Sequence, residues 1–289
     1  MQGMLKIKLL PLLVLPLVTA CTTPQTPFDV FGRSERLQQV QLTSIDNCSV
    51  GCPSGGSGLT LNRQAYTLNN NGSTKFANWV AYKITKETQA SGRSRNWKTD
   101  PDVPAGETLN PVDYKGASVA LKINRGHQAN LASMGGVSDW QTLNYLTNIT
   151  PQKTDLNQGA WARLEDKERN LSKAPDVNAV YVTTGPLYEK HIGFLPGTNK
   201  SHTIPSGYWK VIFTGSSPAN DFFAAFIMEQ STPRSASFCD YQVTVNEIEA
   251  RSGLTLWSDL PQDVQAHLKS KRGQLPQKIG CASTAVSTD

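Results

Sequence analysis

Hydrophobic and polar positions alternate along several short segments of the chain, which is the pattern of half-buried β-strands. The clearest example is residues 74 to 85, where Trp79, Tyr82 and Ile84 follow near alternation. Other segments rich in aromatic and β-branched residues predict further strands. They lie within 59–66 and at 116–123, 177–184, 208–213 and 222–228.

Longer segments without this alternation predict helices. Asp139 to Leu146 is one, and Asp155 to Ser172 is a longer one with few helix-breaking residues after Gly159. Two short helices are expected at 247–251 and 262–270. No internal repeat and no second domain boundary is evident. This order of elements favours a mixed α+β fold built around sheets, in one domain.

The N-terminal residues have the pattern of an export signal. Lys6 and Lys8 precede an apolar run from Leu9 to Val18, and small residues then lead into Cys21. The sequence around Cys21 resembles a bacterial lipobox, so we expect residues 1–20 to be a signal peptide and Cys21 to be lipidated. The alternative is ordinary secretory cleavage nearby, with Cys21 an incidental residue.

The expected location follows from this signal. Residues 21–45 would then be a lipidated cysteine and a flexible tether rich in Thr, Pro and Gln, 46–283 the folded domain, and 284–289 a tail. We expect an exported lipoprotein of a bacterial cell envelope, held at a membrane, most naturally the outer one, through Cys21. Secreted or periplasmic protein is the alternative.

The chain has five cysteines, one too many for complete pairing in an exported protein. Lipidation of Cys21 accounts for the odd one, and the other four can pair. Cys48 and Cys52 are close enough for a tight local loop, while Cys239 and Cys281 flank a longer interval. A bridge across that interval would stabilise the fold by roughly 4 kcal/mol.

The charge balance is only mildly basic. The formal charge of +5 falls to about +3 once Lys6 and Lys8 leave with the signal. Such a charge permits nucleic-acid binding but does not argue for it. The argument must come from where the arginines lie.

One short segment has the parts of a phosphodiesterase site. Hydrolysis of a phosphodiester needs a base to activate water and positive charge at the scissile phosphate. Residues 124–127 read NRGH, in which His127 follows an arginine and a glycine. Histidine is a usable base near neutral pH. The alternative is a structural histidine in a turn.

The helix expected from Asp155 adds a second set of polar residues. Asn157, Glu165 and Arg169 are separated by multiples of four positions and could share one broad helix face. An amide oxygen is a hard ligand suited to magnesium, and Glu165 could hold water around the ion. The alternative is a solvated helix in which Glu165 and Arg169 form an ordinary ion pair.

Long stretches of the sequence resemble the DNA/RNA non-specific endonuclease family. The similarity extends from about Cys48 to Cys281, and such stretches are far more specific than a short motif. They include TKFANWVAYKIT, RNWKTDP, SDWQTLNYLTNITPQ, LNQGAWARLE, TGPLYE, IPSGYWKVIF and LKSK. The resemblance implies the ββα-metal fold, a central antiparallel sheet flanked by helices. The four cysteines after Cys21 also fit two disulfides of the family.

The resemblance implies roles for three residues in particular. His127 matches the general base of the family's DRGH motif, and Asn157 matches its single protein ligand to magnesium. Manganese is a possible substitute for magnesium. Glu165 matches the acid that orients water at the metal.

Other positions match residues that act on the phosphate or lie near it. Arg95 and Arg169 match arginines that hold the phosphate or stabilise the transition state, and Arg125 matches the arginine of DRGH. Asn148 matches an asparagine near the active site.

The chain departs from the family pattern at two positions. Asn124 stands where the family has aspartate, which removes a negative charge from the catalytic motif. Asn130 stands where the family has proline.

The resemblance therefore predicts a magnesium-dependent endonuclease that hydrolyses both DNA and RNA, independently of sequence, to 5′-phosphate products. A second hypothesis is a nucleic-acid-binding envelope lipoprotein whose catalysis is weakened or lost because of Asn124. A third is a phosphodiesterase for small nucleotides on the same scaffold. A homodimer is possible, but no sequence feature decides it.

Overall fold

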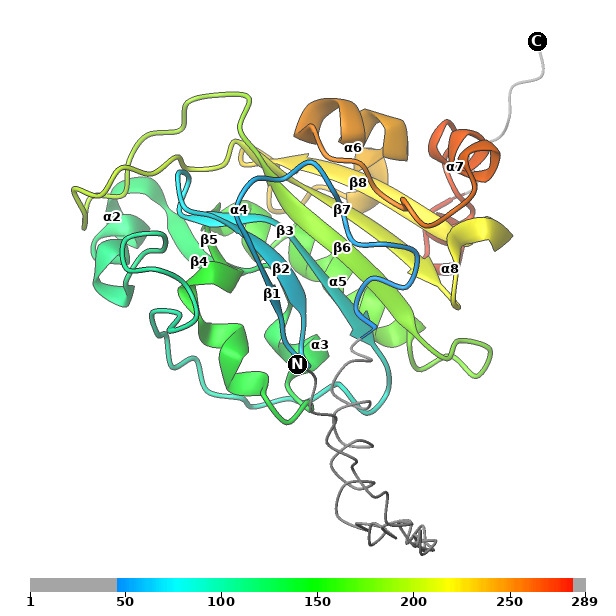
Figure 1. Cartoon of the computed structure of the whole chain (residues 1–289), viewed down its shortest axis with the longest axis horizontal. Coiled ribbons are helices and arrows are strands. Elements are labelled where there is room, and N and C mark those ends of the chain that lie inside the picture. Colours follow the sequence, from blue (N-terminus) through cyan, green and yellow to red (C-terminus); the bar gives the residue numbers. More distant parts are fainter. Residues whose placement is uncertain (1–45, 283–289) are drawn as a thin grey trace, which may run out of the picture. The chain divides into compact units, whose positions relative to one another are not determined.

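The structure is a computed structural model that describes residues 46–282 (Figure 1). The predicted signal peptide, the lipidation of Cys21, the tether and the tail from residue 284 lie outside these residues. Within residues 46–282, no helix is both long and apolar enough to span a membrane.

The central element is a seven-stranded sheet in which every neighbouring pair of strands is antiparallel. Its spatial order is β1-β2-β3-β6-β7-β8-β9. The strands are β1 Leu59–Asn62, β2 Thr67–Asn71, β3 Phe76–Ile84, β6 Val180–Leu187, β7 Gly207–Thr214, β8 Phe223–Glu229 and β9 Gln242–Val243. The sheet confirms the predicted α+β class and most of the predicted strands.

The middle of the sheet is covered on both faces, so its strands are buried throughout. All eight residues of β7 are buried. Because side chains of a strand alternate between faces, Tyr208 and Ile212 join one apolar cluster while Trp209 and Val211 join another. Each face of the sheet therefore has its own hydrophobic core.

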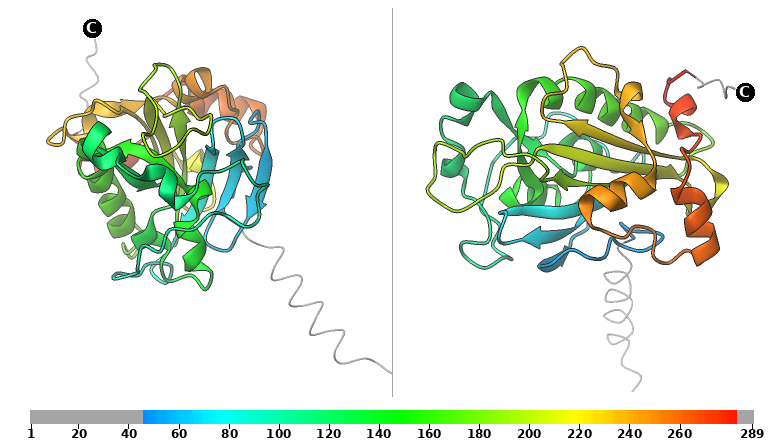
Figure 2. Two further views of the ribbon diagram at one scale, coloured as in Figure 1. Left: turned by 90° about the vertical axis from the view of Figure 1, so that its left-hand side faces the viewer. Right: turned by 90° about the horizontal axis from the view of Figure 1, so that it is seen from above.

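Helices lie on the two faces of this sheet (Figures 1 and 2). Helix α5 packs on one face through Trp161 and Leu164, and α6 packs on the other through Val245 and Ile248. The helices are α2 Ala117–Leu121, α3 Leu131–Met134, α4 Thr154–Asn157, α5 Ala160–Leu171, α6 Val245–Ser252, α7 Gln262–Lys269 and α8 Leu275–Lys278. Short 3-10 segments lie at Pro111–Tyr114, Trp140–Asn144, Leu146–Asn148, Pro218–Asn220 and Phe238–Tyr241.

A separate two-stranded hairpin carries the NRGH segment. Strand β4, Ile123–His127, pairs antiparallel with β5, Ile149–Lys153. The hairpin has its own small core, in which Ile123 and Ile149 pack with Tyr114 and Leu195. Helix α4 follows β5 directly, so the hairpin and the start of the α4–α5 segment are fixed to each other.

The strand predicted at 116–123 is wrong for most of its length. Residues 117–121 form helix α2, bounded by Gly116 at φ 79° and Lys122 at φ 52°. Only Ala117 of the helix is buried, so its apolar residues do not form a strand face. A short apolar run fits helix and strand equally well. The NRGH segment therefore forms strand β4 rather than following one.

The two longer predicted helices are interrupted. The segment 139–146 forms two 3-10 turns instead of an α-helix, and 155–172 is divided into α4 and α5. Gly159 marks this division. A Cβ there would lie 2.2 Å from the Asp155 carbonyl oxygen and 2.7 Å from that of Arg234. The close approach of the 234 loop is a tertiary contact that the helical pattern does not show.

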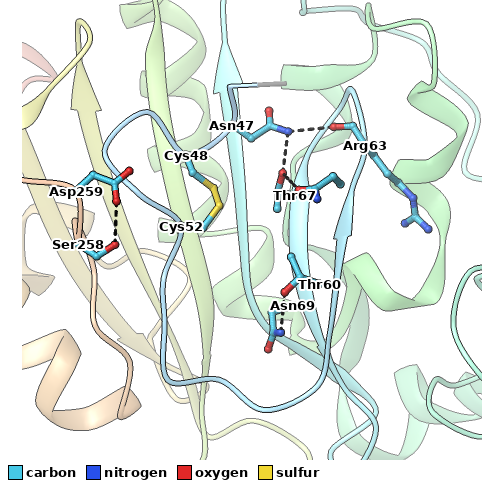
Figure 3. Close-up of a disulfide and its surroundings, with 10 residues drawn as sticks. Asn47, Cys48, Cys52, Thr60, Arg63, Thr67, Asn69, Ser258 and Asp259 are labelled. Carbon is cyan, nitrogen blue, oxygen red and sulfur yellow. Dashed lines mark hydrogen bonds between the residues drawn. A yellow bond between two sulfur atoms is a disulfide. The ribbon is translucent and has the colours of Figure 1, made fainter. Parts of the chain in front are cut away.

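Both cysteine pairs form disulfides, as predicted. Cys48 bonds to Cys52, and Cys239 bonds to Cys281. The first closes a tight loop beside the β1–β2 hairpin (Figure 3). Next to it, Asn47 donates to the Arg63 carbonyl at 3.0 Å and to Thr67 Oγ1 at 3.3 Å. These bonds attach the start of the domain to the edge of the sheet.

Candidate active site

A groove of about 700 Å³ lies between the β4–β5 hairpin and the α4–α5 segment. All seven residues that the sequence predicted for the site line it, although they come from three separate parts of the chain. These residues are Arg95, Asn124, Arg125, His127, Asn157, Glu165 and Arg169. The fold therefore brings the predicted set together completely.

The glycine of NRGH allows the hairpin to close tightly. Gly126 pairs with Thr150 in the β4–β5 register. A Cβ at Gly126 would lie 2.4 Å from Oε1 of Gln152 and 2.9 Å from its Cβ, so a larger residue would push the strands apart. This glycine thus sets the position of the histidine that follows it.

Asn144 fixes the orientation of the His127 ring. The Asn144 Nδ2 donates to the Ser94 carbonyl at 3.0 Å, so its Oδ1 is the atom directed at His127. That oxygen lies 3.3 Å from His127 Nε2, which must carry the proton because Oδ1 can only accept. The other nitrogen, Nδ1, then has the free lone pair of a base.

The surroundings of His127 keep its ring neutral. Desolvation lowers the pKa of His127 to about 4, and the charge of Arg95 acts in the same direction, while the Asn144 contact opposes it. The Trp97 ring lies 5.2 Å from the histidine ring and forms part of the groove wall. At neutral pH the histidine is therefore available to accept a proton.

Asn157, at the end of α4, is held by the residue that departs from the family pattern. Its Nδ2 donates to Asn124 Oδ1 at 3.3 Å, and Gln158 Nε2 donates to the same oxygen at 3.2 Å. The Asn157 Oδ1 is left without a hydrogen bond to residues 46–282 and is available as a ligand. The contacts of Asn124 are therefore with the expected metal ligand rather than with His127.

Glu165 lies between the groove and the buried side of α5. It is 7% exposed, so the alternative of a solvated helix face is wrong. Burial raises its pKa to about 7. Lys210 Nζ, at 3.9 Å, opposes that rise, but Lys210 bonds more closely to Glu168 at 2.8 Å.

Glu165 and Arg169 do not form the ion pair of the alternative interpretation, and an amide bridges them instead. Arg169 forms its ion pair with Asp166 on the same helix. Asn130 lies between the two groove residues, donating to Glu165 Oε2 at 2.7 Å and accepting from Arg169 Nη1 at 2.9 Å.

The other two arginines of the groove have no carboxylate partner within residues 46–282. Arg125 lies against the rings of Trp97 and Tyr114, at 5.7 and 5.1 Å from their centroids. Its Nη2 donates to the Pro111 carbonyl at 2.7 Å. The Arg95 side chain is exposed at the rim. Their positive charge is therefore available to an anion in the groove.

The donor atoms of the groove fit a hard divalent cation. The free Oδ1 of Asn157 and the carboxylate of Glu165 are oxygen donors, which magnesium and manganese prefer. Within residues 46–282, no group of three or more His, Cys, Asp or Glu side chains could hold a metal ion. An ion bound at Asn157 would take its remaining ligands from water and phosphate, as magnesium commonly does.

Sequence reasoning missed Asn144 and Lys210. Asn144 is 17 positions from His127, and Lys210 is 42 positions from Glu168, so no spacing rule connects either pair. The sequence offers one signal, for Lys210. A lysine within an otherwise apolar strand is expected to be buried, and a buried charge requires a partner. Asn148 is buried and bonds to both backbone groups of Ala129, so it supports the turn after His127.

Comparison with known proteins gives consistent relatives. The model of the DNA/RNA non-specific endonuclease family matches residues 43–263. A nuclease of Serratia marcescens is 64% identical over 241 residues, which covers 83% of this chain and 91% of the relative. Human mitochondrial endonuclease G is 28% identical over 66% of this chain and 67% of its own length.

The fold also resembles a solved structure. A crystal structure of the EndoG/EndoGI complex aligns with a TM-score of 0.62 at 22% identity, covering 75% of this chain and 91% of that one. At this identity the likeness concerns the fold alone, and it agrees with the ββα-metal arrangement expected from the sequence.

Proposed function

The chain belongs to the DNA/RNA non-specific endonuclease family, and on that premise we propose that it hydrolyses DNA and RNA with magnesium, His127 as general base and Asn157 as metal ligand. The products would carry 5′-phosphate ends. The chain is an endonuclease, and its family is metal-dependent. The identity of the metal and the role of each residue are the proposal.

One observation carries the proposal. Seven residues chosen from the sequence, spread from Arg95 to Arg169, line a single groove. That groove combines a base, an oxygen ligand for a cation and three arginines, which are the parts that phosphodiester hydrolysis needs.

His127 has the geometry of a general base. Its Nε2 proton is held by Asn144, which leaves Nδ1 to take a proton from the attacking water. Asn144 stabilises the ring further as it becomes cationic, because its Oδ1 accepts from the charged form. The pKa of about 4 keeps the base unprotonated at neutral pH before substrate binds.

The arginines explain why both DNA and RNA would be substrates. Arg95, Arg125 and Arg169 recognise phosphate oxygens, which DNA and RNA share, and such contacts carry no base information. Positive charge at the groove would also stabilise the developing charge on the phosphate.

The divalent ion, when bound, would supply Lewis-acid stabilisation of the phosphate and leaving oxygen. Asn157 would hold it through Oδ1, an orientation favoured by donation of Nδ2 to Asn124. Glu165 would hold water beside it as a carboxylate. Since the pKa of Glu165 is about 7 and that of His127 about 4, the carboxylate and the neutral imidazole predominate together above pH 7.

The second candidate function is nucleic-acid binding with weakened catalysis. It rests on Asn124, a neutral amide that contacts Asn157 where the family motif has a carboxylate. Slow turnover with intact binding would support it.

Nicking of supercoiled plasmid and digestion of an RNA transcript by purified residues 22–289 test these candidates. We expect both substrates to be cut with magnesium and neither with excess EDTA. Asn157→Ala should require more magnesium and cut more slowly. Binding without any cutting at saturating magnesium would favour the second candidate. Equal activity of Asn157→Ala at every magnesium concentration would exclude that residue as the ligand.

We also propose that the protein is an exported envelope lipoprotein held at a membrane through Cys21. The support is the basic start, the apolar run and the small residues before Cys21. A lipidated N-terminus with several acyl chains would anchor stably. Full-length protein should sediment with membranes, and Cys21→Ser should release it or block its processing. Wild-type protein recovered in soluble form with a free Cys21 thiol would contradict the proposal.

A further inference from the structure

Asn130 lies in the groove, three residues after His127, and begins helix α3. Its Oδ1 accepts from the backbone N–H of Ser133 at 3.0 Å, the usual bond of an N-terminal helix cap. This bond fixes the orientation of the amide, because only the oxygen can accept from an N–H. The Nδ2 is therefore directed away from α3.

The same amide joins α3 to two residues of α5. Nδ2 donates to Glu165 Oε2 at 2.7 Å, and Oδ1 accepts from Arg169 Nη1 at 2.9 Å. Glu165 and Arg169 form no direct ion pair, since the carboxylate partner of Arg169 is Asp166. Asn130 is thus the group that links them.

We propose that Asn130 is a positioning residue that holds the Glu165 carboxylate toward the groove and keeps the Arg169 guanidinium next to it. This inference rests on the proposed function, which assigns catalytic work to Glu165. It concerns a position where the family motif has proline, whose side chain makes no hydrogen bond.

A buried cation lies on the other side of Glu165 from the groove. Lys210 Nζ is 3.9 Å from Glu165 Oε1, on the sheet side of α5. Without the Asn130 amide, the carboxylate would be drawn toward this buried cation and away from the groove. Asn130 therefore opposes a competing attraction.

Asn130→Asp separates positioning from helix capping. Aspartate keeps the oxygen that accepts from Ser133 and Arg169, but it cannot donate to Glu165 and repels it. We expect kcat to fall by roughly ten-fold to a hundred-fold, the range for residues that orient a catalytic group, with a smaller change in KM. Because the helix cap is kept, any fall in melting temperature comes from the repulsion between the two carboxylates. Asn130→Ala should show a similar fall in kcat with some loss of stability.

Two further variants serve as controls. Asn130→Pro should fold, because the backbone at φ −70° and ψ 131° suits proline, and it should lose kcat as Asn130→Ala does. Thr244→Ala removes a similar cap at α6, remote from the groove, and should lower stability without changing kcat.

A double-mutant cycle with Glu165→Gln decides the mechanism. If Asn130 acts through Glu165, Asn130→Ala should cost little further activity once Glu165→Gln is present. Additive losses, or wild-type kcat in both Asn130→Asp and Asn130→Ala, would overturn the inference while leaving the proposed function intact. Wild-type kcat in Glu165→Gln alone would instead remove the proposed role of Glu165, and the inference with it.

Discussion

The groove and the α6–α7 face of the molecule differ in how their cations are paired. On the α6–α7 face, Arg251 pairs with Glu189 at 2.7 Å and Lys269 with Glu249 at 2.7 Å. In the groove, Arg95 and Arg125 have no carboxylate partner within the described part of the chain. The mild net charge does not show this difference, because it does not record which cations are paired.

The difference teaches where to look for a phosphate site. An arginine already paired with a carboxylate offers little to a second anion, whereas an unpaired arginine keeps its full attraction. The formal charge of +5 says little about binding, whereas the two unpaired guanidinium groups of Arg95 and Arg125 at one groove favour an anion there. The comparison predicts that substitutions in the groove change activity and that those on the α6–α7 face change stability at most.

The largest expected effect is that of His127→Ala. Loss of the base should reduce turnover by about 10²–10⁴-fold, because water would lack a positioned proton acceptor. The matched control is His267→Ala on α7, which should keep wild-type turnover. Steady-state kinetics on plasmid and RNA provide the measurement. Unchanged turnover of His127→Ala would exclude its assignment.

The buried ion pair behind Glu165 should affect stability. Lys210 is fully buried against Glu168, so Lys210→Met leaves a buried carboxylate without its partner. We expect the free energy of unfolding to fall by about 3–5 kcal/mol. Urea unfolding with intact disulfides measures this.

The exposed pair of Lys190 and Glu229 gives the control for Lys210. Lys190→Met should change the free energy of unfolding by less than about 1 kcal/mol. A similar small change for Lys210→Met would mean that Glu168 is readily neutralised in place.

Asn124→Asp should increase activity by restoring the carboxylate of the family motif. It would accept from Asn157 and Gln158 as Asn124 does, and its charge would favour a cation held at Asn157. Turnover should rise by roughly ten-fold, with the largest gain at limiting magnesium and little change in thermal stability. Magnesium titration of activity measures this effect. Equal or lower turnover would show that the site works as well with asparagine.

Arg95→Gln and Arg251→Gln test the charge comparison directly. With single-stranded DNA and EDTA to prevent cleavage, Arg95→Gln should weaken binding several-fold. It should also reduce the slope of log K against log salt by roughly 0.7, one phosphate contact. Arg251→Gln should leave the slope unchanged. Equal effects of the two variants would refute the distinction between the two regions.

The smallest expected effect is on acid stability. The pKa of His127 is lowered to about 4 from 6.5, so its contribution to stability is present above pH 6.5 and lost as pH falls toward 4. The raised pKa of Glu165 acts in the opposite sense, but Glu165 is present both in the wild type and in His127→Ala, so its effect cancels when the two are compared.

Comparing wild type with His127→Ala at pH 7.5 and pH 5 isolates the histidine. Wild type should lose about 1 kcal/mol more on acidification, allowing for the partial exposure of the ring. Urea unfolding at the two pH values measures the difference. An equal loss in the two proteins would mean that His127 titrates normally.

Much of the site could be predicted from the sequence because its residues lie close together within two motifs. NRGH places His127 and Arg125 on one strand, and the LNQGAWARLE stretch places Asn157 at the end of α4 and Glu165 in the adjoining α5. Strand predictions also held where side chains nearly alternate, as in β3, and where aromatic and β-branched residues are concentrated, as in β7. Helix α2 and the break at Gly159 were missed, because left-handed residues and a distant loop decided them.

The sequence by itself determined which residues could do the chemistry, the pairing of the cysteines and the alternation that builds the central sheet. Only the tertiary structure decided which of those residues are oriented, and by what. Asn144 sets the tautomer of His127, Asn130 bridges Glu165 to Arg169, and Lys210 approaches Glu165 from the sheet. These contacts join residues 17 to 45 positions apart, and tertiary packing, not any sequence period, brings them within hydrogen-bond or ion-pair range.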